Sequence, residues 1–401
     1  PPRSEAEVFR GKEVIYSWIQ GRGLEALAGH LQWLEESDHI DAATRGVLAG
    51  RIRRQLTRTI AAMEECRANN GGRVYFCMTP AGTPLEIADC KYLKPAETLM
   101  KESNYSDLFY FKGLFKAAWV LGWGEKANEA AAGLKTVLDD IEQRRFRTDQ
   151  QTFDPKNQVR FIPGKHGQGP MMIALLGIAA VGEVKPDPVW FGYGERFIRR
   201  IIDLHVNRRR YPELAEYDFI EAVDDNGAPW NENGMIMCDP GHALEFIGLA
   251  TRCLLAMRRA DYGAALIEEC AQLFPPLLCH CFDLGFNPSA GGICKAYDLC
   301  SRRVINSDMP WWSLPETMRA AAGLIELAPA MPQRNRINEV IAACSNAFAQ
   351  RFINYPVHMM AYQTRNAAGE AIDVIPATPD ADPGYHTGLS VIDFIRYLKR
   401  H

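Results

Sequence analysis

The stretch Cys238-Asp-Pro-Gly-His-Ala-Leu-Glu-Phe246 stands at the start of a strongly apolar helical pattern. Asp239 is a typical N-cap residue and Pro240 suits the first helical position, so a helix is expected to begin here. His242 then falls in the first turn, and Glu245 lies one turn further along the same face. The stretch therefore predicts an apolar helix whose N-terminus carries two polar groups that point the same way.

Helical periodicity continues on both sides of this stretch, whereas strand-like patterns are rare in the 401 residues. The expected helices cover residues 5–20, 43–67, 106–121, 125–143, 168–182, 190–206, 240–258, 262–279, 315–328, 333–351 and 388–399. No Pro/Ser-rich linker, low-complexity tract or change in composition separates them. The simplest prediction is a single domain over residues 1–401.

Between the expected helices, one kind of insert recurs: a short β-like run, a turn that contains glycine, and a return. It is found at residues 73–82, 219–227 and 358–369. Helix pairs joined by such hairpins at irregular spacing are typical of a toroid whose inner helices wall a central cleft. We therefore expect an all-α fold with short β-hairpin inserts.

Composition narrows the classes of partner. Hydrophobic residues make up 47% of the chain and charged residues 23%, as in a globular protein with a large core. The net charge of −4 gives no electrostatic reason to expect nucleic acid or an anionic membrane as a partner. The longest apolar stretch, Met171–Val181, is far shorter than the roughly 20 residues of a membrane span. We expect a cytoplasmic protein with a small or neutral partner.

The cysteines do not indicate a metal site. Eleven of them are scattered along the chain, which favours reduced thiols over a disulfide framework. The one local cluster, Cys279-His280-Cys281 with Cys294 and Cys300 downstream, lacks the paired spacing of a zinc site. Walker and dinucleotide-binding spacings are absent from the sequence as well. Neither a metal nor a cofactor is expected.

His242 is a candidate base. The helix N-terminus disfavours a protonated imidazole, so His242 is expected to stay neutral, and Glu245 one turn away is placed to hold its tautomer. The alternative is that His242 only caps the helix and that Glu245 is solvated.

The stretch Met309-Pro-Trp-Trp-Ser-Leu-Pro-Glu316 marks a second helix start with a carboxylate in its first turn. The faces of Trp311 and Trp312 could stack on the apolar side of a sugar ring while Glu316 accepts hydrogen bonds from its hydroxyl groups. Core packing would also explain two tryptophans, so both interpretations stay open at this point.

A third segment, Asp382-Pro-Gly-Tyr-His-Thr387, places Tyr385 and His386 on a loop rich in Gly and Pro, just before the last expected helix. Taken alone, a histidine on such a loop is more often a surface residue.

Together and in this order, the three segments resemble the N-acylglucosamine 2-epimerase superfamily, which includes cellobiose 2-epimerases and mannose-type aldose–ketose isomerases. The resemblance extends from about Gly71 onward and includes Asp89-Cys-Lys-Tyr92 and the helix start Gly169-Pro-Met-Met172. It implies an (α/α)6 barrel whose hairpin inserts line one face. Family members are often dimers, so the resemblance leaves a homodimer open.

The resemblance also implies roles for individual residues. His242 and His386 would be the two acid/base groups on opposite faces of carbon 2 of a reducing sugar, and Glu245 and Glu316 would orient histidine and sugar. One base removes the proton next to the open-chain aldehyde and an acid on the other face returns it, which inverts the centre. Trp311, Trp312 and Tyr385 would contact the sugar, for which an N-acyl hexosamine is the first expectation.

Two family arginines are missing. The position three residues after His386 is Leu389, and the segment after the first hairpin reads Lys91-Tyr-Leu-Lys-Pro-Ala-Glu97. An enediolate needs a fixed donor or charge near its oxyanion. Lys94, Lys112 or another group is therefore expected to take this part, or else the activity is weak or altered.

Two further residues are candidates for sugar contact. His166 lies in a Gly-rich loop before a helix start, and Trp230 follows the turn at 225–227. Both could equally be ordinary loop residues.

Three other functions stay open beside the epimerase. A mannose-type isomerase would return the proton to carbon 1, and a catalytically silent protein would bind carbohydrate or regulate without turnover. A glycoside hydrolase or polysaccharide lyase would use Glu245 and Glu316 as its paired carboxylates.

Overall fold

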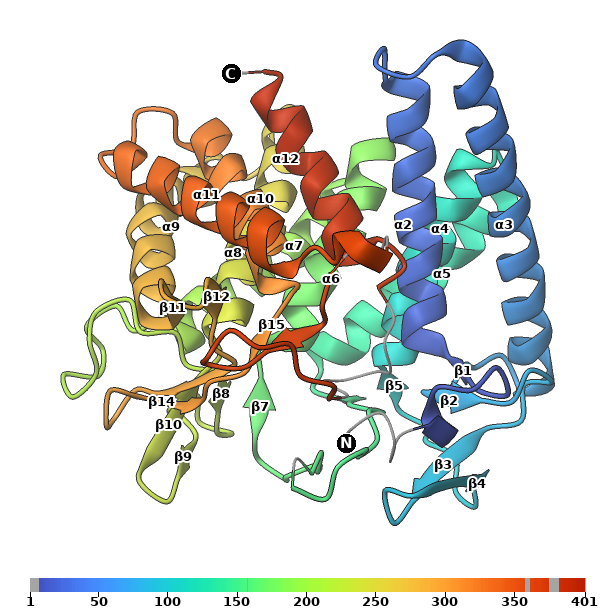
Figure 1. Cartoon of the computed structure of the whole chain (residues 1–401), viewed down its shortest axis with the longest axis horizontal. Coiled ribbons are helices and arrows are strands. Elements are labelled where there is room, and N and C mark those ends of the chain that lie inside the picture. Colours follow the sequence, from blue (N-terminus) through green and yellow to red (C-terminus); the bar gives the residue numbers. More distant parts are fainter. Residues whose placement is uncertain (1–6, 157, 358–360, 375–381, 401) are drawn as a thin grey trace. The chain divides into compact units, whose positions relative to one another are not determined.

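The computed structural model describes residues 7–156, 158–357, 361–374 and 382–400, and these residues are mostly helical (Figure 1). They fall into two compact units, unit 1 with Pro1–Phe161 and Asp373–Ile392, and unit 2 with Ile162–Ile372 and Asp393–His401. The single domain expected over residues 1–401 stays a prediction. In the described part of the chain, every helix is too short or too polar to cross a membrane.

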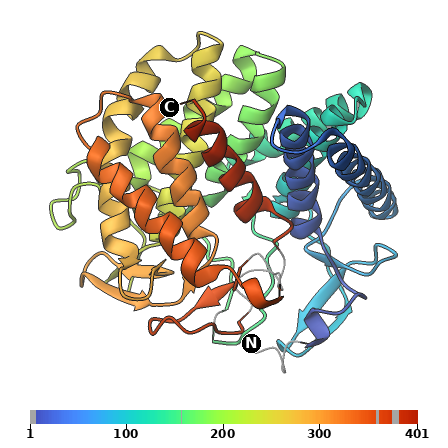
Figure 2. The same cartoon turned by 45° about the horizontal axis from the view of Figure 1, so that its top comes forward.

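The described residues of unit 1 before Phe161 contain four α-helices. These are α2 (Ser17–Glu36), α3 (Ala42–Asn69), α4 (Tyr105–Val120) and α5 (Gly124–Glu142). Helix α2 packs against α3 and α4, and α4 packs against α5; Figure 2 shows α2 and α3 as an antiparallel pair. The strands are β1 (Ile15–Tyr16), β2 (Cys77–Met78), β3 (Leu85–Ala88), β4 (Tyr92–Pro95), β5 (Ser103–Asn104) and β6 (Phe146–Arg147), and they pair two by two. The short π-helical turn η4 (Tyr385–Leu389) lies against α2.

Unit 2 contains α6 (Gly169–Val184), α7 (Pro188–His205), α8 (Pro240–Arg259), α9 (Ala264–Gly285), α10 (Ser313–Leu327) and α11 (Arg334–Ala347). Helix α8 is central, since it packs against α6, α9 and α10. The last helix, α12 (Ser390–Leu398), has its first turn in unit 1 and continues in unit 2 from Asp393.

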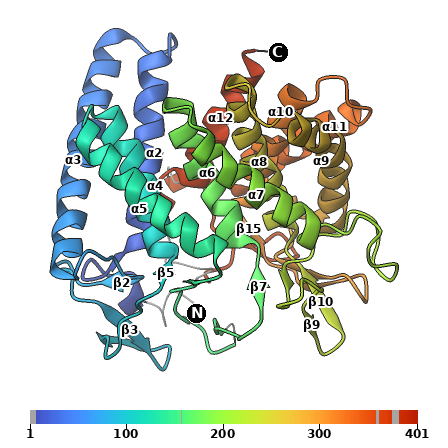
Figure 3. The ribbon, with the colours of Figure 1, turned by 180° about the vertical axis from the view of Figure 1, so that it is seen from behind.

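The strands of unit 2 lie at one end of its helices (Figure 3). They are β7 (His166–Gly167), β8 (Ala222–Val223), β9 (Asn231–Glu232), β10 (Met235–Cys238), β11 (Phe286–Asn287), β12 (Gly292–Ile293), β13 (Ala296–Asp298), β14 (Arg303–Asn306), β15 (Met309–Pro310) and β16 (Thr364–Arg365). Four of them form one sheet in the order β14-β13-β10-β9, and β10 runs directly into α8. The sheet therefore fixes the N-terminus of α8.

The sequence separates inner from outer helices. Helix α8 buries 16 of its 20 residues, because it is apolar on nearly every side. Helix α3 buries only four of its 28 residues, Leu56, Ile60, Met63 and Cys66, which recur at helical spacing along one stripe. The chain thus alternates between helices that form the core and helices that cover it.

The three predicted hairpin inserts share one turn geometry. Each turns at a glycine with a positive φ, at Gly82, Gly227 and Gly369. In each, the glycine N–H donates to the carbonyl three residues before it, and an isolated antiparallel bridge follows at Met78–Pro84, Val223–Pro229 or Arg365–Ala371. These hairpins are confirmed, although residues 358–360 of the third insert lie outside the described residues.

The prediction of a first helix at 5–20 is wrong, because the helix is α2 at Ser17–Glu36. Glycines at 21 and 23 lower the helix propensity of this segment, so its residue pattern did not predict a helix. Packing explains Gly21: a Cβ there would lie 2.5 Å from the backbone of Phe109 in α4. The crossing of α2 and α4 overrides the local propensity.

This crossing gives the first testable prediction. A Cβ on Gly113 of α4 would lie 2.2 Å from the carbonyl oxygen of Gly21, so Gly113→Ala should lower the free energy of unfolding by about 2–3 kcal/mol. Gly46→Ala in α3 is the control, because its Cβ would meet nothing within 4 Å, and it should raise stability by about 0.5–1 kcal/mol. Urea unfolding followed by circular dichroism checks both, and equal stability of the two variants would refute the argument.

Candidate active site

Asp239 fixes the start of α8 as the sequence predicted. Its side chain accepts a hydrogen bond from the His242 backbone N–H at 3.2 Å, with Pro240 at the first helical position. The carboxylate is buried, and it also forms an ion pair with Lys295, which precedes β13. One side chain therefore ties together the helix start and the hairpin that carries Lys295.

The His242 imidazole is held by two carboxylates. Its Nδ1 lies 2.9 Å from Oε1 of Glu221 and 3.3 Å from Oδ2 of Asp239. The imidazole is 30% exposed and thus remains open to a ligand. Glu221 was missed by the sequence analysis, which expected Glu245 to orient this ring.

The expectation that His242 stays neutral is wrong. Burial disfavours the charged imidazole, but the negative charges of Asp239 and Glu221 outweigh burial and raise the pKa of His242 to about 9. Two carboxylates within 3.3 Å therefore dominate over the dipole of the helix N-terminus. At neutral pH the imidazole carries a proton that it can donate.

Trp312 covers one face of the imidazole. The two rings stack with centroids 5.5 Å apart and an angle of 25° between their planes. Gly241 makes this contact possible, since a Cβ there would lie 2.9 Å from Trp312. The Lys295 ammonium lies 5.4 Å from the centroid of the Trp312 ring, within the range of a cation–π interaction. Lys295 is 38% exposed, so its ammonium group, although paired with Asp239, is partly open to solvent next to Trp312.

Glu245 and Glu316 are both buried, on α8 and in the first turn of α10. Glu316 forms an ion pair with Arg319 at 2.8 Å, and Nε of Arg319 lies 3.3 Å from Asp393 in α12. The negative charge of Glu316 is thus compensated by a residue three positions along its own helix.

Trp311 is also buried, and its backbone N–H donates to the carbonyl of Gln363 at 3.0 Å. This contact continues the β15–β16 pairing. Of the two tryptophans, Trp312 is the one in ring contact with His242.

Within unit 1, His386 and Tyr385 lie in η4 and are buried. Their rings meet edge to face with centroids 4.8 Å apart. The Tyr385 hydroxyl is hydrogen-bonded to Lys112, whose ammonium lies 2.8 Å from Glu25. Lys112 thus links α2 and α4 to the segment that carries His386.

The position of the missing arginine, Leu389, is packed closely against α2. A Cβ on Gly29 would lie 2.3 Å from Cδ2 of Leu389, and Leu389 is buried. Lys94, expected as a substitute cation, lies on the β3–β4 hairpin and pairs with Glu86 at 2.9 Å and Glu97 at 2.7 Å. The positive charge of Lys94 is therefore compensated by two carboxylates of its own hairpin segment.

His166 and Trp230 lie on either side of β8 in unit 2. His166 pairs with Val223 in the β7–β8 ladder, and its Nε2 lies 2.7 Å from Asp225. The Trp230 backbone donates to the carbonyl of Ala222, while its buried indole N–H has no partner among the described residues. Both residues therefore lie on segments that pair with β8, the strand that directly follows Glu221.

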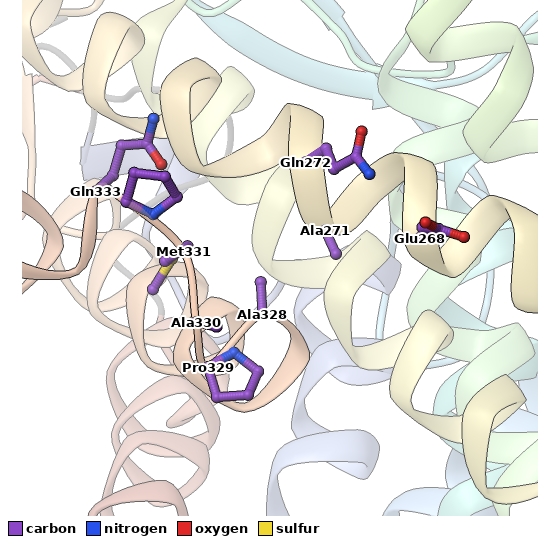
Figure 4. A pocket seen from close by; sticks show the side chains of 9 residues that line it. Glu268, Ala271, Gln272, Ala328, Pro329, Ala330, Met331 and Gln333 are labelled. Carbon is purple, nitrogen blue, oxygen red and sulfur yellow. The ribbon is translucent and has the colours of Figure 1, made fainter.

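An apolar groove of about 440 Å³ lies elsewhere in unit 2, between α9 and the segment after α10 (Figure 4). Its lining residues are Glu268, Ala271, Gln272 and 328–333. They include none of the candidate site residues and offer one carboxylate, so the groove adds nothing to the chemistry around His242.

Comparison with known proteins gives a consistent result. Residues 103–387 match the family model described as N-acylglucosamine 2-epimerase (GlcNAc 2-epimerase). The structure is similar to cellobiose 2-epimerase from Bacillus thermoamylovorans, with a TM-score of 0.68 and 13% identity over 96% of this chain and 89% of that one. It is also similar to a D-mannose isomerase, with a TM-score of 0.65 and 14% identity over 96% and 88%. Among proteins of curated function, none matched the sequence.

The same fold occurs in proteins of other activity. The α-1,2-mannosidase from Trichoderma reesei gives a TM-score of 0.58 and 10% identity over 96% of this chain and 77% of that one. At these identities the structural likeness establishes the fold alone. It confirms the expected class, the (α/α)6 barrel of paired helices with short hairpins.

The pKa of His242 can be tested directly. Glu221→Gln removes one of the two negative charges next to Nδ1, so the pKa should fall from about 9 by on the order of one unit. Histidine-selective NMR titration measures this. Asp225→Asn is the control, because Asp225 makes the same kind of contact with His166 and should leave His242 unchanged. An unaltered His242 titration in the Glu221 variant would contradict the assignment.

The Glu316–Arg319 pair gives a stability prediction. Glu316→Gln removes a negative charge that compensates the buried Arg319 guanidinium, so the free energy of unfolding should fall by about 3 kcal/mol. Glu339→Gln is the control, since its pair with Arg336 is exposed and should contribute less than about 1 kcal/mol. Thermal melts compare the two, and similar small losses would mean that Glu316 is not held by this pair.

Proposed function

Since the chain belongs to the N-acylglucosamine 2-epimerase family, we propose that it epimerises a free reducing sugar by moving the proton at carbon 2. The proposed substrate is of the N-acylglucosamine or N-acylmannosamine type. A sugar is supported as the substrate class by the family, and the acyl group by the family description alone.

One observation carries the proposal: an accessible imidazole is clamped by Glu221 and Asp239 and covered on one face by Trp312. Such a clamp fixes the direction in which Nε2 points, because Nδ1 is engaged by the carboxylates. An oriented ring nitrogen at an aromatic surface is what proton transfer to or from a sugar carbon requires.

The charges around His242 favour its action as the acid. With its pKa raised to about 9, the imidazole is protonated at neutral pH and can return a proton to carbon 2. The proposed base is His386, which the family resemblance pairs with His242. The reverse reaction requires the opposite protonation states of the two histidines, so the rate of each direction depends on the fraction of His242 that carries a proton.

Lys295 is the cation that we assign to the developing oxyanion. The enediolate formed by loss of the carbon 2 proton needs a positive charge close by, and Lys295 is accessible and adjacent to Trp312. Lys112 is less suited, because its ammonium is fully buried against Glu25. Lys94 is less suited because two carboxylates pair with it on its hairpin, whereas Lys295 pairs with one, that of Asp239. Glu245 and Glu316 remain the proposed carboxylates that orient the reacting groups.

Aldose–ketose isomerisation is the second candidate. The chemistry differs only in where the proton returns, since delivery to carbon 1 of the same enediolate gives a ketose. The product therefore separates the two reactions.

The deciding experiment is proton NMR of the purified protein in D2O. It is run with N-acetylmannosamine, N-acetylglucosamine, mannose, glucose and cellobiose, and follows loss of the carbon 2 proton. Deuterium at carbon 2 together with the epimer is the expected result for an N-acetyl sugar. A ketose product would replace epimerase by isomerase, and a protein without exchange on any of the five sugars would be a binding or regulatory protein.

The histidines are tested by substitution. His242→Asn and His386→Asn should each abolish epimerisation while changing the free energy of unfolding by no more than about 1–2 kcal/mol. His39→Asn is the control, because His39 is 65% exposed in the loop between α2 and α3 and should retain full activity. A fully active His386 variant would exclude the two-histidine mechanism.

A further inference from the structure

The side chain of Gln168 is buried without a partner. It precedes α6, is 0% exposed, and neither its amide oxygen nor its amide nitrogen makes a hydrogen bond within the described residues. An unpaired buried polar group costs about 1–3 kcal/mol, and native proteins contain few of them. The Gln168 amide therefore has both a donor and an acceptor available for a group outside the chain.

Strand register places Gln168 opposite Glu221, the residue that holds His242. The β7–β8 ladder pairs Gly167 with Ala222 in antiparallel fashion, so the next residues along are Gln168 and Glu221, opposite each other. Glu221 holds His242 through Oε1, while its Oε2 is also buried without a partner in the described part of the chain. Two unpartnered groups therefore come from neighbouring segments next to the proposed acid.

We propose that Gln168 and Glu221 bind adjacent hydroxyl groups of the sugar, and that Gln168 is a specificity-determining residue. This inference rests on the proposed function and names the part of the substrate that is recognised. A planar side-chain amide carries an acceptor and a donor side by side, which matches two neighbouring hydroxyls, one that donates and one that accepts. Oε2 of Glu221 can only accept a hydrogen bond, so its partner is a hydroxyl group that donates.

The same geometry argues against recognition of the N-acyl group by Gln168. In a trans secondary amide the N–H and the C=O point in opposite directions, so one side chain cannot engage both. The site therefore selects sugars by a free pair of neighbouring hydroxyls, whether carbon 2 carries a hydroxyl or an acylamino group. A sugar that lacks one hydroxyl of the pair should be rejected, because the amide is then left half unpaired.

The test uses Gln168→Leu, which keeps the size of the side chain and removes both polar atoms. Because the amide has no partner in the protein, this variant should be at least as stable as the parent in a thermal melt. Its affinity for the substrate should fall by about 10- to 100-fold, the loss of two hydrogen bonds. Isothermal titration calorimetry with N-acetylmannosamine and its 3-, 4- and 6-deoxy analogues measures this.

The matched control is Gln151→Leu in unit 1. The Gln151 amide is satisfied, since it accepts from Ile87 N–H at 2.6 Å and donates to the Leu85 carbonyl at 2.9 Å. This variant should lose stability and keep its sugar affinity, the reverse of the Gln168 variant.

The deoxy sugars identify the hydroxyls. Two of the deoxy analogues should bind the parent protein more weakly than the full sugar does. The same two analogues should bind Gln168→Leu as well as the full sugar does. The two hydroxyls that these analogues lack should be on neighbouring carbons. A Gln168 variant that loses stability, or that binds the full sugar as tightly as the parent, overturns the inference and leaves the epimerase proposal standing. A parent that binds none of the sugars overturns the epimerase proposal itself, and with it this assignment.

Discussion

The site in unit 2 depends on one buried negative charge, that of Asp239. A buried carboxylate is costly unless it is paired, so the groups that compensate it must assemble with it. These groups are the His242 imidazole, the His242 backbone N–H and the Lys295 ammonium. The start of α8, the end of β10 and the hairpin of β13 are thereby fixed to one another, and the stacking of Trp312 on His242 follows from this arrangement.

Much of the helical framework could be predicted from local patterns. The stripe of α3 and the apolar surface of α8 follow directly from residue spacing, and the cap formed by Asp239 and Pro240 was predicted from residue type. Helix α2 was not predicted, because Gly21 lowers helix propensity and is present for its contact with α4. Such a glycine is explained only by a neighbour about 90 residues away in the sequence, since the contact is with Phe109.

The parts of the site that escaped prediction share a physical cause. Glu221 and Lys295 reach the vicinity of His242 through strand pairing and hairpins, and neither falls in a local motif with it. The same non-local charges reversed the expected protonation of His242, since the helix dipole can be judged from the sequence but the approach of Glu221 cannot. Residue types at a helix start thus predict the position of an ionisable side chain, but they do not predict its protonation state, which depends on non-local charges.

The charges around His242 also bear on how a lysine could replace an arginine in the proposed reaction. With His242 protonated, the two positive groups, His242 and Lys295, balance the two negative ones, Asp239 and Glu221. Loss of the imidazole proton leaves a net negative charge, which opposes an enediolate in the same place. A lysine is a single point charge on a flexible chain and lacks the two-pronged grip of arginine. Stabilisation of the oxyanion is then shared between Lys295 and the proton on His242, so that proton transfer and oxyanion binding are coupled through one cluster of charges.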